Sequence, residues 1–162
     1  MDILDIIYAN DIKKINSIIK NNKLFIFKKD EFDNTALIYA SKFCKNDTTI
    51  IKILIKNNAN VNIQNKFGIT PLSICCIHFY NTSSINNIKI LLENGADPNL
   101  KNLNGDTSLN LCLKYYYNKN YDELKKLILL LLEYNVNLNI KNNKNENILI
   151  ISENRNLPND FI

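Results

Sequence analysis

One short segment contains residue types that can perform nucleophilic catalysis. Cys75 and Cys76 lie close to His78 in the sequence, and a cysteine thiolate activated by a histidine base is a common enzymatic nucleophile. His78 is the single histidine of the chain, and such a centre also needs an orienting acid and an oxyanion-binding group. No nucleophile elbow, glycine-rich phosphate loop or H-E-x-x-H motif accompanies these residues. A cysteine-dependent enzyme therefore stays an alternative and is not the leading interpretation.

The same segment is a poor metal site. A structural zinc ion takes four ligands, usually from spaced cysteine pairs, whereas the adjacent side chains of a helix point about 100° apart. We expect no metal and no other cofactor. The chain has four cysteines, and its opening segment, residues 1–5, lacks the basic start of a secretory signal. We therefore expect reduced cysteines in an intracellular, cytoplasmic protein.

The elements that must position this segment repeat along the chain. An opening block occurs as DNTALIYA at 33–40, GITPLSIC at 68–75 and GDTSLNLC at 105–112, with a fainter copy, NENILII, at 145–151. A closing block occurs as ILIKNNANVN at 53–62, ILLENGADPN at 90–99 and LLLEYNVNLN at 130–139. Several copies in phase indicate a repeat architecture.

The two blocks resemble the ankyrin repeat, which opens with T-P-L-H-x-A and closes with L-L-x-x-G-A-D-x-N. The nearest matches are Thr70-Pro71-Leu72 and the GADPN of residues 95–99. The threonines of successive opening blocks are 35 and 37 residues apart, close to the family period of about 33. The resemblance covers nearly the whole chain. It implies an all-α solenoid of stacked helix-turn-helix units with short hairpin loops.

The resemblance also implies a single domain over residues 1–162. Its expected units are an N-terminal capping repeat at 1–29, full repeats at 30–64, 65–101 and 102–141, and a partial C-terminal repeat at 142–162. The closing block is delayed in the later repeats. We expect the additional residues between the paired helices, at 45–48, 78–84 and 116–122, as longer turns or as extended helices.

Residue types at special backbone positions agree with this interpretation. Each opening-block threonine precedes an apolar helix that its hydroxyl can cap, and Pro71 occupies a first helical position. The glycines of the hairpin turns and helix ends are replaced in other copies by Asp or Asn, which tolerate positive φ best. These positions are Asp33, Gly68, Gly105 and Asn145 in the hairpins, and Asn58, Gly95 and Asn135 at the helix ends.

Other positions of the repeat have structural interpretations. Cys75 and Cys112 stand where the family has a small buried alanine, so we expect core thiols with raised pKa values. The side chains of Asn62, Asn99 and Asn139, which close the repeats, are expected to bond backbone groups in the turns between repeats. The family histidine after T-P-L is absent. Its hydrogen-bond support for the threonine is therefore expected to be lost, most clearly where Ile38 replaces it.

The resemblance implies a protein-binding surface made of the hairpin tips and the exposed, concave side of the first helices. By position, the tip residues are Glu31, Phe32, Asn34, Lys66, Phe67, Ile69, Leu103, Asn104 and Asp106, and the helix residues are Lys42, Phe43, Ile77, His78, Lys114 and Tyr115. Phe43, His78 and Tyr115 share one repeat position and should form a column, with Ala9 below them. Exposed aromatic rings are good interface anchors. The alternative is that these rings, with Phe32 and Phe67, only stack between repeats.

The leading function is thus a non-enzymatic scaffold or adaptor that binds a protein. The short, divergent array resembles those of large DNA viruses, intracellular bacteria and protists, which implies a host factor as partner. The net charge of +4 is a weak bias without long basic runs, so nucleic-acid binding stays a minor alternative. No membrane partner is expected. We expect a monomer. The Ile-rich helix at 148–151 is a candidate for dimerisation, or for cover by the tail ending at Ile162.

Overall fold

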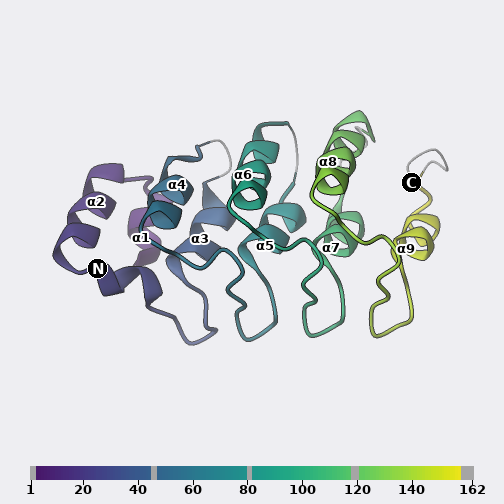
Figure 1. Cartoon of the computed structure of the whole chain (residues 1–162), viewed down its shortest axis with the longest axis horizontal. Helices are drawn as coiled ribbons and strands as arrows, with labels where there is room; N and C mark the ends of the chain where they lie inside the picture. The colour runs from purple at the N-terminus through teal and green to yellow at the C-terminus, as the bar shows by residue number, and fades with distance from the viewer. Residues whose placement is uncertain (1–2, 45–46, 80–81, 118–120, 158–162) are drawn as a thin grey trace.

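The computed structural model describes residues 3–44, 47–79, 82–117 and 121–157, and these residues form two rows of stacked helices (Figure 1). The inner row contains α1 (Ile3–Tyr8), α3 (Ala36–Phe43), α5 (Pro71–Ile77), α7 (Ser108–Tyr115) and α9 (Ile148–Asn154). The outer row contains α2 (Ile12–Asn21), α4 (Thr49–Lys56), α6 (Thr82–Glu93) and α8 (Tyr121–Glu133). A short 3-10 helix, η1 (Lys23–Phe27), follows α2. The fold is the all-α solenoid that the repeats predict.

Helix starts are capped as the sequence predicts in two of the three full repeats. The hydroxyl of Thr70 accepts from the backbone N–H of Ser73, and the Ser73 side chain accepts from the N–H of Thr70, which makes a reciprocal capping box. Thr107 caps α7 over a longer distance, 3.4 Å. The cap predicted at Thr35 is wrong. Its hydroxyl is buried and, among the described residues, has no hydrogen-bond partner.

The residue three positions along the helix also lacks the polar side chain that completes the capping box of α5. In α3 this position is Ile38, whose side chain offers no reciprocal donor or acceptor, whereas α5 has Ser73 there. The expected loss of polar support at Ile38 is therefore confirmed.

All seven predicted positions have positive φ, and Asn10 and Asn156, both at 51°, adopt it as well. Asp33 and Asn145 adopt φ of 63° in their hairpins, beside values of 72° for Gly68 and 77° for Gly105. The helix ends at Asn58, Gly95 and Asn135 have φ of 69°, 86° and 58°. Asn and Asp are the side chains that reach this left-handed region at least cost, which explains how they replace glycine here.

An aspartate or asparagine organises every hairpin. Its Oδ1 accepts from the backbone N–H groups two and four residues further along, which closes the loop before the helix starts. These residues are Asp30, Asn65, Asn102 and Asn142. The hairpins form the lower edge of the array in Figure 1.

Neighbouring repeats are joined by hydrogen bonds at two levels. At the tips, one backbone bond crosses each junction, from Lys66 N to Phe32 O, from Leu103 N to Phe67 O and from Asn143 N to Asn104 O, over 2.9, 3.1 and 2.9 Å. After the outer helices, Asn62 donates to Gly95 O and accepts from Asp97 N, and Asn99 makes the same pair of bonds with Asn135 and Asn137. The predicted role of Asn62 and Asn99 is confirmed. Asn139 donates its backbone N–H to Asn137 Oδ1.

The additional residues of the later repeats lengthen the outer helices. The inner helices α3, α5 and α7 have 8, 7 and 8 residues, whereas α4, α6 and α8 have 8, 12 and 13. Parts of the predicted insertions, at 45–46, 80–81 and 118–120, lie outside the described residues. The helix-extension interpretation is therefore the one that the helix bounds support.

The last described helix, α9, divides its apolar residues between two faces. Ile148 and Ile151 are buried, whereas Leu149 and Ile150 are 48% and 37% exposed. The tail predicted to cover this end, 158–162, lies outside the described residues, and dimerisation through α9 stays a prediction. No helix among the described residues is both long and apolar enough to cross a bilayer.

Candidate functional site

The hairpin tips and the inner helices α1, α3, α5, α7 and α9 together form one side of the array, here called the inner face (Figure 1). Small residues in register, such as Ala40, Cys75 and Cys112, lie buried in the inner helices and allow close stacking. Exposed side chains of the inner helices include those of Lys42 and Tyr115, near the C-terminal ends of α3 and α7. Two hollows lie on this face, one near each end.

The hollow near the N-terminus is lined by aromatic rings. It measures about 380 Å³, and its lining residues are Asp5, Tyr8, Ala9 and Phe43. The rings of Tyr8 and Phe43 meet edge to face at 5.5 Å between centroids, and Tyr8 is 75% exposed. An apolar or aromatic side chain of a ligand would find large contact area here at low entropy cost.

Phe43 is held in position from two further sides. The ring of Tyr39 stacks on it at 6.3 Å, and Lys42 Nζ lies 5.3 Å from its centroid. Tyr39 is itself fixed, because its hydroxyl donates to Asp30 Oδ2 in the hairpin. The hydrogen bonds to Asp30 outweigh its desolvation and hold the pKa of that carboxyl below its ordinary value.

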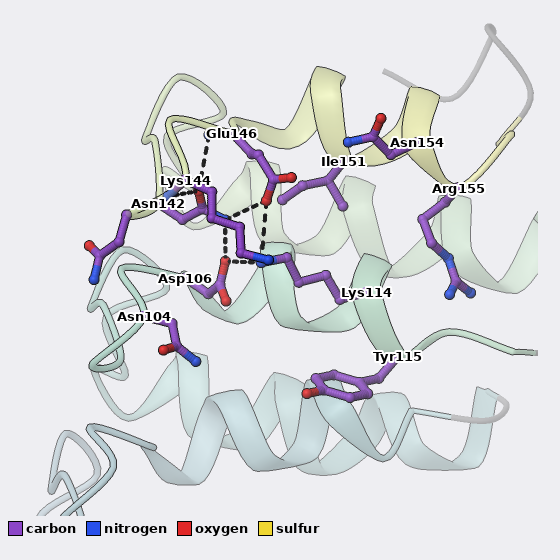
Figure 2. A pocket seen from close by; sticks show the side chains of 11 residues that line it. Asn104, Asp106, Lys114, Tyr115, Asn142, Lys144, Glu146, Ile151, Asn154 and Arg155 are labelled. Carbon is purple, nitrogen blue, oxygen red and sulfur yellow. Dashed lines mark hydrogen bonds and ion pairs between the residues drawn. The ribbon is translucent and has the colours of Figure 1, made fainter.

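The hollow near the C-terminus is polar and larger, about 560 Å³ (Figure 2). Its lining residues are Asn104, Asp106, Lys114, Tyr115, Asn142, Asn143, Lys144, Glu146, Ile151, Asn154 and Arg155. They come from the hairpins and inner helices of the last two repeats. Figure 2 shows four of these side chains meeting at its centre, with Tyr115 and Arg155 to one side.

The four central side chains form a charged network. Lys114 Nζ donates to Asp106 Oδ1 at 2.6 Å and lies 3.7 Å from Glu146 Oε2. Asn142 Nδ2 donates to the same two oxygens, at 2.8 and 2.9 Å. The hydrogen bond from Asn142, with help from Lys114 and Lys144, lowers the pKa of Glu146. Lys114 is thus neutralised by two carboxylates, and Lys144 is left exposed at the rim.

A row of apolar tips follows the lower edge of the inner face. The rings of Phe32 and Phe67 stack at 6.1 Å between centroids, and they remain 45% and 53% exposed. Leu103, one residue before the equivalent position in the next hairpin, is 69% exposed. The rings of Phe32 and Phe67 therefore stack between repeats and still remain accessible to a ligand.

Comparison with known families agrees with this architecture. A family model described as ankyrin repeats (three copies) matches residues 6–102 and 37–142, which together cover most of the chain. The chain belongs to the ankyrin-repeat family. A search of curated proteins finds no match. Ankyrin repeats are generally protein–protein interaction modules, and family members are typically not enzymes.

Most of the predicted contact residues are accessible in this ankyrin array. Exposed side chains are those of Glu31, Phe32, Lys42, Lys66, Phe67, Leu103, Asn104 and Tyr115, and partly exposed ones are those of Asn34, Phe43, Ile69, Ile77, His78 and Lys114. Asp106 is the exception. It is 3% exposed, because Lys114 and Asn142 enclose it, and it therefore acts as a link between repeats. That these residues bind a partner stays a prediction.

The predicted column is divided between the two hollows. Ala9 and Phe43 line the N-terminal hollow together, and Tyr115 lines the C-terminal one. His78 ends α5 between them, half-buried. The ring pair that stacks between these repeats is Phe79 with Tyr116, one residue further along and buried in the core.

Several residues that line the hollows are not among the contact residues predicted from the sequence. Tyr8 occupies the repeat position of Lys42. In the partial repeat, Glu146 occupies the position of Asp106, and Arg155 that of Tyr115. The repeat period identifies these residues when the alignment of the full repeats is extended to the capping repeat and to the partial repeat.

The cysteine segment of the ankyrin array has no accessible thiol. Cys75, Cys76 and Cys112 are free and buried, as predicted for the core positions. Burial raises the pKa of Cys75 and Cys112 to about 12 and that of Cys76 well above its ordinary value. These thiols stay protonated near neutral pH, where a nucleophile must be a thiolate. In the described part of the chain, no cluster of His, Cys, Asp or Glu could hold a metal ion.

Proposed function

We propose that this ankyrin array is a non-enzymatic adaptor that binds a protein partner across its inner face. The observation that supports this most is the placement of both hollows on that one face, with exposed aromatic residues in each. Tyr8 and Phe43 line an apolar hollow at one end, and Tyr115 lines a charged hollow at the other. A partner segment that reaches from one to the other would cross the helices in between.

The partner class that we propose is an intracellular protein. The four cysteines are reduced and buried, which suits a reducing compartment such as the cytoplasm. The resemblance to short arrays of viruses and intracellular organisms makes a host protein our proposed partner.

The test compares an inner-face variant with an outer-row control. The triple variant Phe43→Ala, His78→Ala and Tyr115→Ala removes the central aromatic groups of the face. The control Leu129→Ala with Leu132→Ala removes exposed apolar side chains, 53% and 43% exposed, from outer helix α8. Each protein is used to capture partners from cell lysate, the captured proteins are identified by mass spectrometry, and their affinities are measured with purified components.

We expect the affinity of the inner-face variant for the captured partner to fall by about thirtyfold or more, because buried aromatic anchors each contribute about 2 kcal/mol or more at interfaces. The control should retain the partner. Circular dichroism should show equal helix content in all three proteins. A partner held equally well by the folded triple variant would contradict the proposal.

A further inference from the structure

The positive charge of the chain is concentrated near one end. Residues 12–29 contain six lysines and no acidic residue. The totals are 20 basic and 16 acidic residues, so the remainder of the chain has 14 basic and 16 acidic residues. This segment therefore carries a formal charge of +6 and the rest −2. It comprises α2, η1 and the first residues after η1, at the purple end of Figure 1.

The 3-10 helix η1 directs two apolar side chains toward solvent within this basic segment. In a 3-10 helix, side chains three residues apart are eclipsed, so Leu24 and Phe27 lie on one ridge. They are 71% and 50% exposed. Ile26, on another side of the helix, is 2% exposed and anchors η1 in the core, and the side chain of Asn22 caps its start. The ridge is thus presented by a fixed element.

Lysines precede and follow the two ridge residues in the sequence. Lys20 lies in the last turn of α2, Lys23 begins η1 and Lys28 follows it, and all three are exposed. In the part of the chain that the structure describes, no carboxylate pairs with any of the three, whereas the next lysine, Lys29, pairs with Asp33 at 3.5 Å. Lys20, Lys23, Leu24, Phe27 and Lys28 are here called the basic apolar patch.

We propose that the basic apolar patch attaches the protein to an anionic lipid surface. Leucine and phenylalanine surrounded by lysines is the composition by which peripheral proteins sit at the interface of acidic membranes. The apolar side chains enter the acyl boundary while the ammonium groups meet lipid phosphates. Such attachment needs no spanning helix, so it is compatible with the absence of one among the described residues.

The composition of the patch favours lipid over a protein or a nucleic acid. Protein interfaces are depleted of lysine and have a larger apolar centre, and here two apolar side chains stand between three lysines. The two hollows described above lie on the inner face and contain none of the patch residues. A nucleic acid would contact the lysines and could stack a base on Phe27. Leu24 would add nothing to such binding, because its side chain has neither a charge nor an aromatic ring.

Sedimentation with lipid vesicles tests the proposal. The protein is mixed with vesicles of phosphatidylcholine alone or with added phosphatidylserine, and the bound fraction is measured at low and high salt. We expect binding to the phosphatidylserine vesicles only, weakened by salt. Lys20→Gln, Lys23→Gln and Lys28→Gln together should weaken it by about tenfold or more. Leu24→Ser with Phe27→Ser should weaken it by about tenfold.

Matched controls exist elsewhere on the surface. Lys52→Gln, Lys56→Gln and Lys125→Gln remove three exposed lysines of the outer row, and Phe67→Ser with Leu103→Ser removes an equally exposed pair at the tips. Both controls should bind vesicles as the wild type does. Equal loss in the lysine control would show a general charge effect and overturn the proposal. Absence of binding, or equal binding to neutral vesicles, would also overturn it.

A fluorescent reporter separates insertion from adsorption. The chain has no tryptophan, so Phe27→Trp introduces a single one. Its emission should shift to the blue when phosphatidylserine vesicles are added, because the indole enters the acyl boundary. Sedimentation without a blue shift would overturn insertion. Binding of duplex DNA that the patch lysine variant abolishes, without any vesicle binding, would assign the patch to nucleic acid.

Discussion

The side chain of Asn65 donates a hydrogen bond over 2.8 Å to Oδ1 of Asn34 in the preceding repeat. One junction further, Ile69 stands at the repeat position of Asn34 and offers no acceptor to Asn102. At the last junction, Asp106 occupies that position and accepts from Asn142, also over 2.8 Å. The middle junction of the array therefore lacks a polar link that both of its neighbours have.

Ile69→Asn should restore this link. The matched comparison is Ile69→Ala, which loses the same apolar side chain without adding an acceptor. We expect the Asn variant to exceed the Ala variant in free energy of unfolding by about 1 kcal/mol, the usual net contribution of one hydrogen bond. Urea denaturation followed by circular dichroism measures the difference. It should vanish when both are combined with Asn102→Ala, and a difference that persists would disprove the pairing.

Replacing the opening threonines by valine should have opposite consequences in two repeats. Thr70→Val removes the hydroxyl that accepts from the backbone N–H of Ser73 and that contacts the Ser73 hydroxyl, and it should cost about 1–2 kcal/mol of stability. Thr35→Val removes a buried hydroxyl without a partner in the described structure and should be neutral, or stabilising by up to about 1 kcal/mol. Chemical denaturation of both variants gives the comparison. Equal losses would mean that Thr35 also caps its helix.

Two glycines with similar φ should tolerate asparagine differently. A Cβ at Gly105 would lie 2.8 Å from the backbone nitrogen of Asn143, whereas a Cβ at Gly95 meets nothing within 4 Å. Asparagine tolerates the positive φ at both sites, so only the contact distinguishes them. Gly105→Asn should cost about 1–3 kcal/mol, as overpacking does, and Gly95→Asn less than about 0.5 kcal/mol. Thermal unfolding compares them, and the reverse order would refute the contact argument.

The four buried thiols should react only when the array unfolds. In the folded protein, a disulfide reagent at slightly alkaline pH should leave Cys75, Cys76 and Cys112 unmodified, because they are buried and protonated. Denaturant should release all four. Spectrophotometric titration counts the reacting thiols. Rapid modification of Cys75 or Cys76 in the folded state would revive the alternative of a cysteine-dependent enzyme.

Alkaline pH should destabilise the array through the same thiols. In the unfolded chain the cysteine thiols have a pKa of about 8.5. In the folded protein the pKa is about 11 for Cys44 and about 12 for Cys75. The folded pKa values are raised, so this stabilisation is complete below about pH 8.5 and is lost as pH rises toward 11–12. Each thiol adds a slope of about 1.4 kcal/mol per pH unit in that window. Denaturation at a series of pH values should show a shallower slope for Cys75→Ala, and an unchanged slope would count against this account.

The parts of the fold that follow from local chemistry were predictable from the sequence. A left-handed residue such as Asp33 or Asn58, and a cap such as Thr70, depend on a few neighbouring backbone groups, so residue type and spacing suffice. The same holds for Asn62 and Asn99, which bond the next turn. Their repetition in phase made the solenoid predictable as well.

The candidate site was predictable only in part, because its shape depends on contacts across repeats. The hollow around Phe43 needs Tyr8 from the capping repeat, and the charged hollow needs Glu146 and Arg155 from the partial one. The burial of Asp106 follows from two partners, one of them in another repeat. The position of the basic apolar patch depended on η1, since only its three-residue turn brings Leu24 and Phe27 onto one ridge.

The lengthening of the outer helices, from 8 residues in α4 to 13 in α8, leaves the tips evenly joined. One backbone bond of nearly constant length, 2.9 to 3.1 Å, crosses every tip junction regardless of how many residues its repeat contains. The step between successive tips is therefore independent of repeat length along the chain. Insertions and deletions in the outer helices can therefore accumulate over evolutionary time without changing the spacing of the hairpin tips. A ligand that contacts several tips would meet the same spacing in each case.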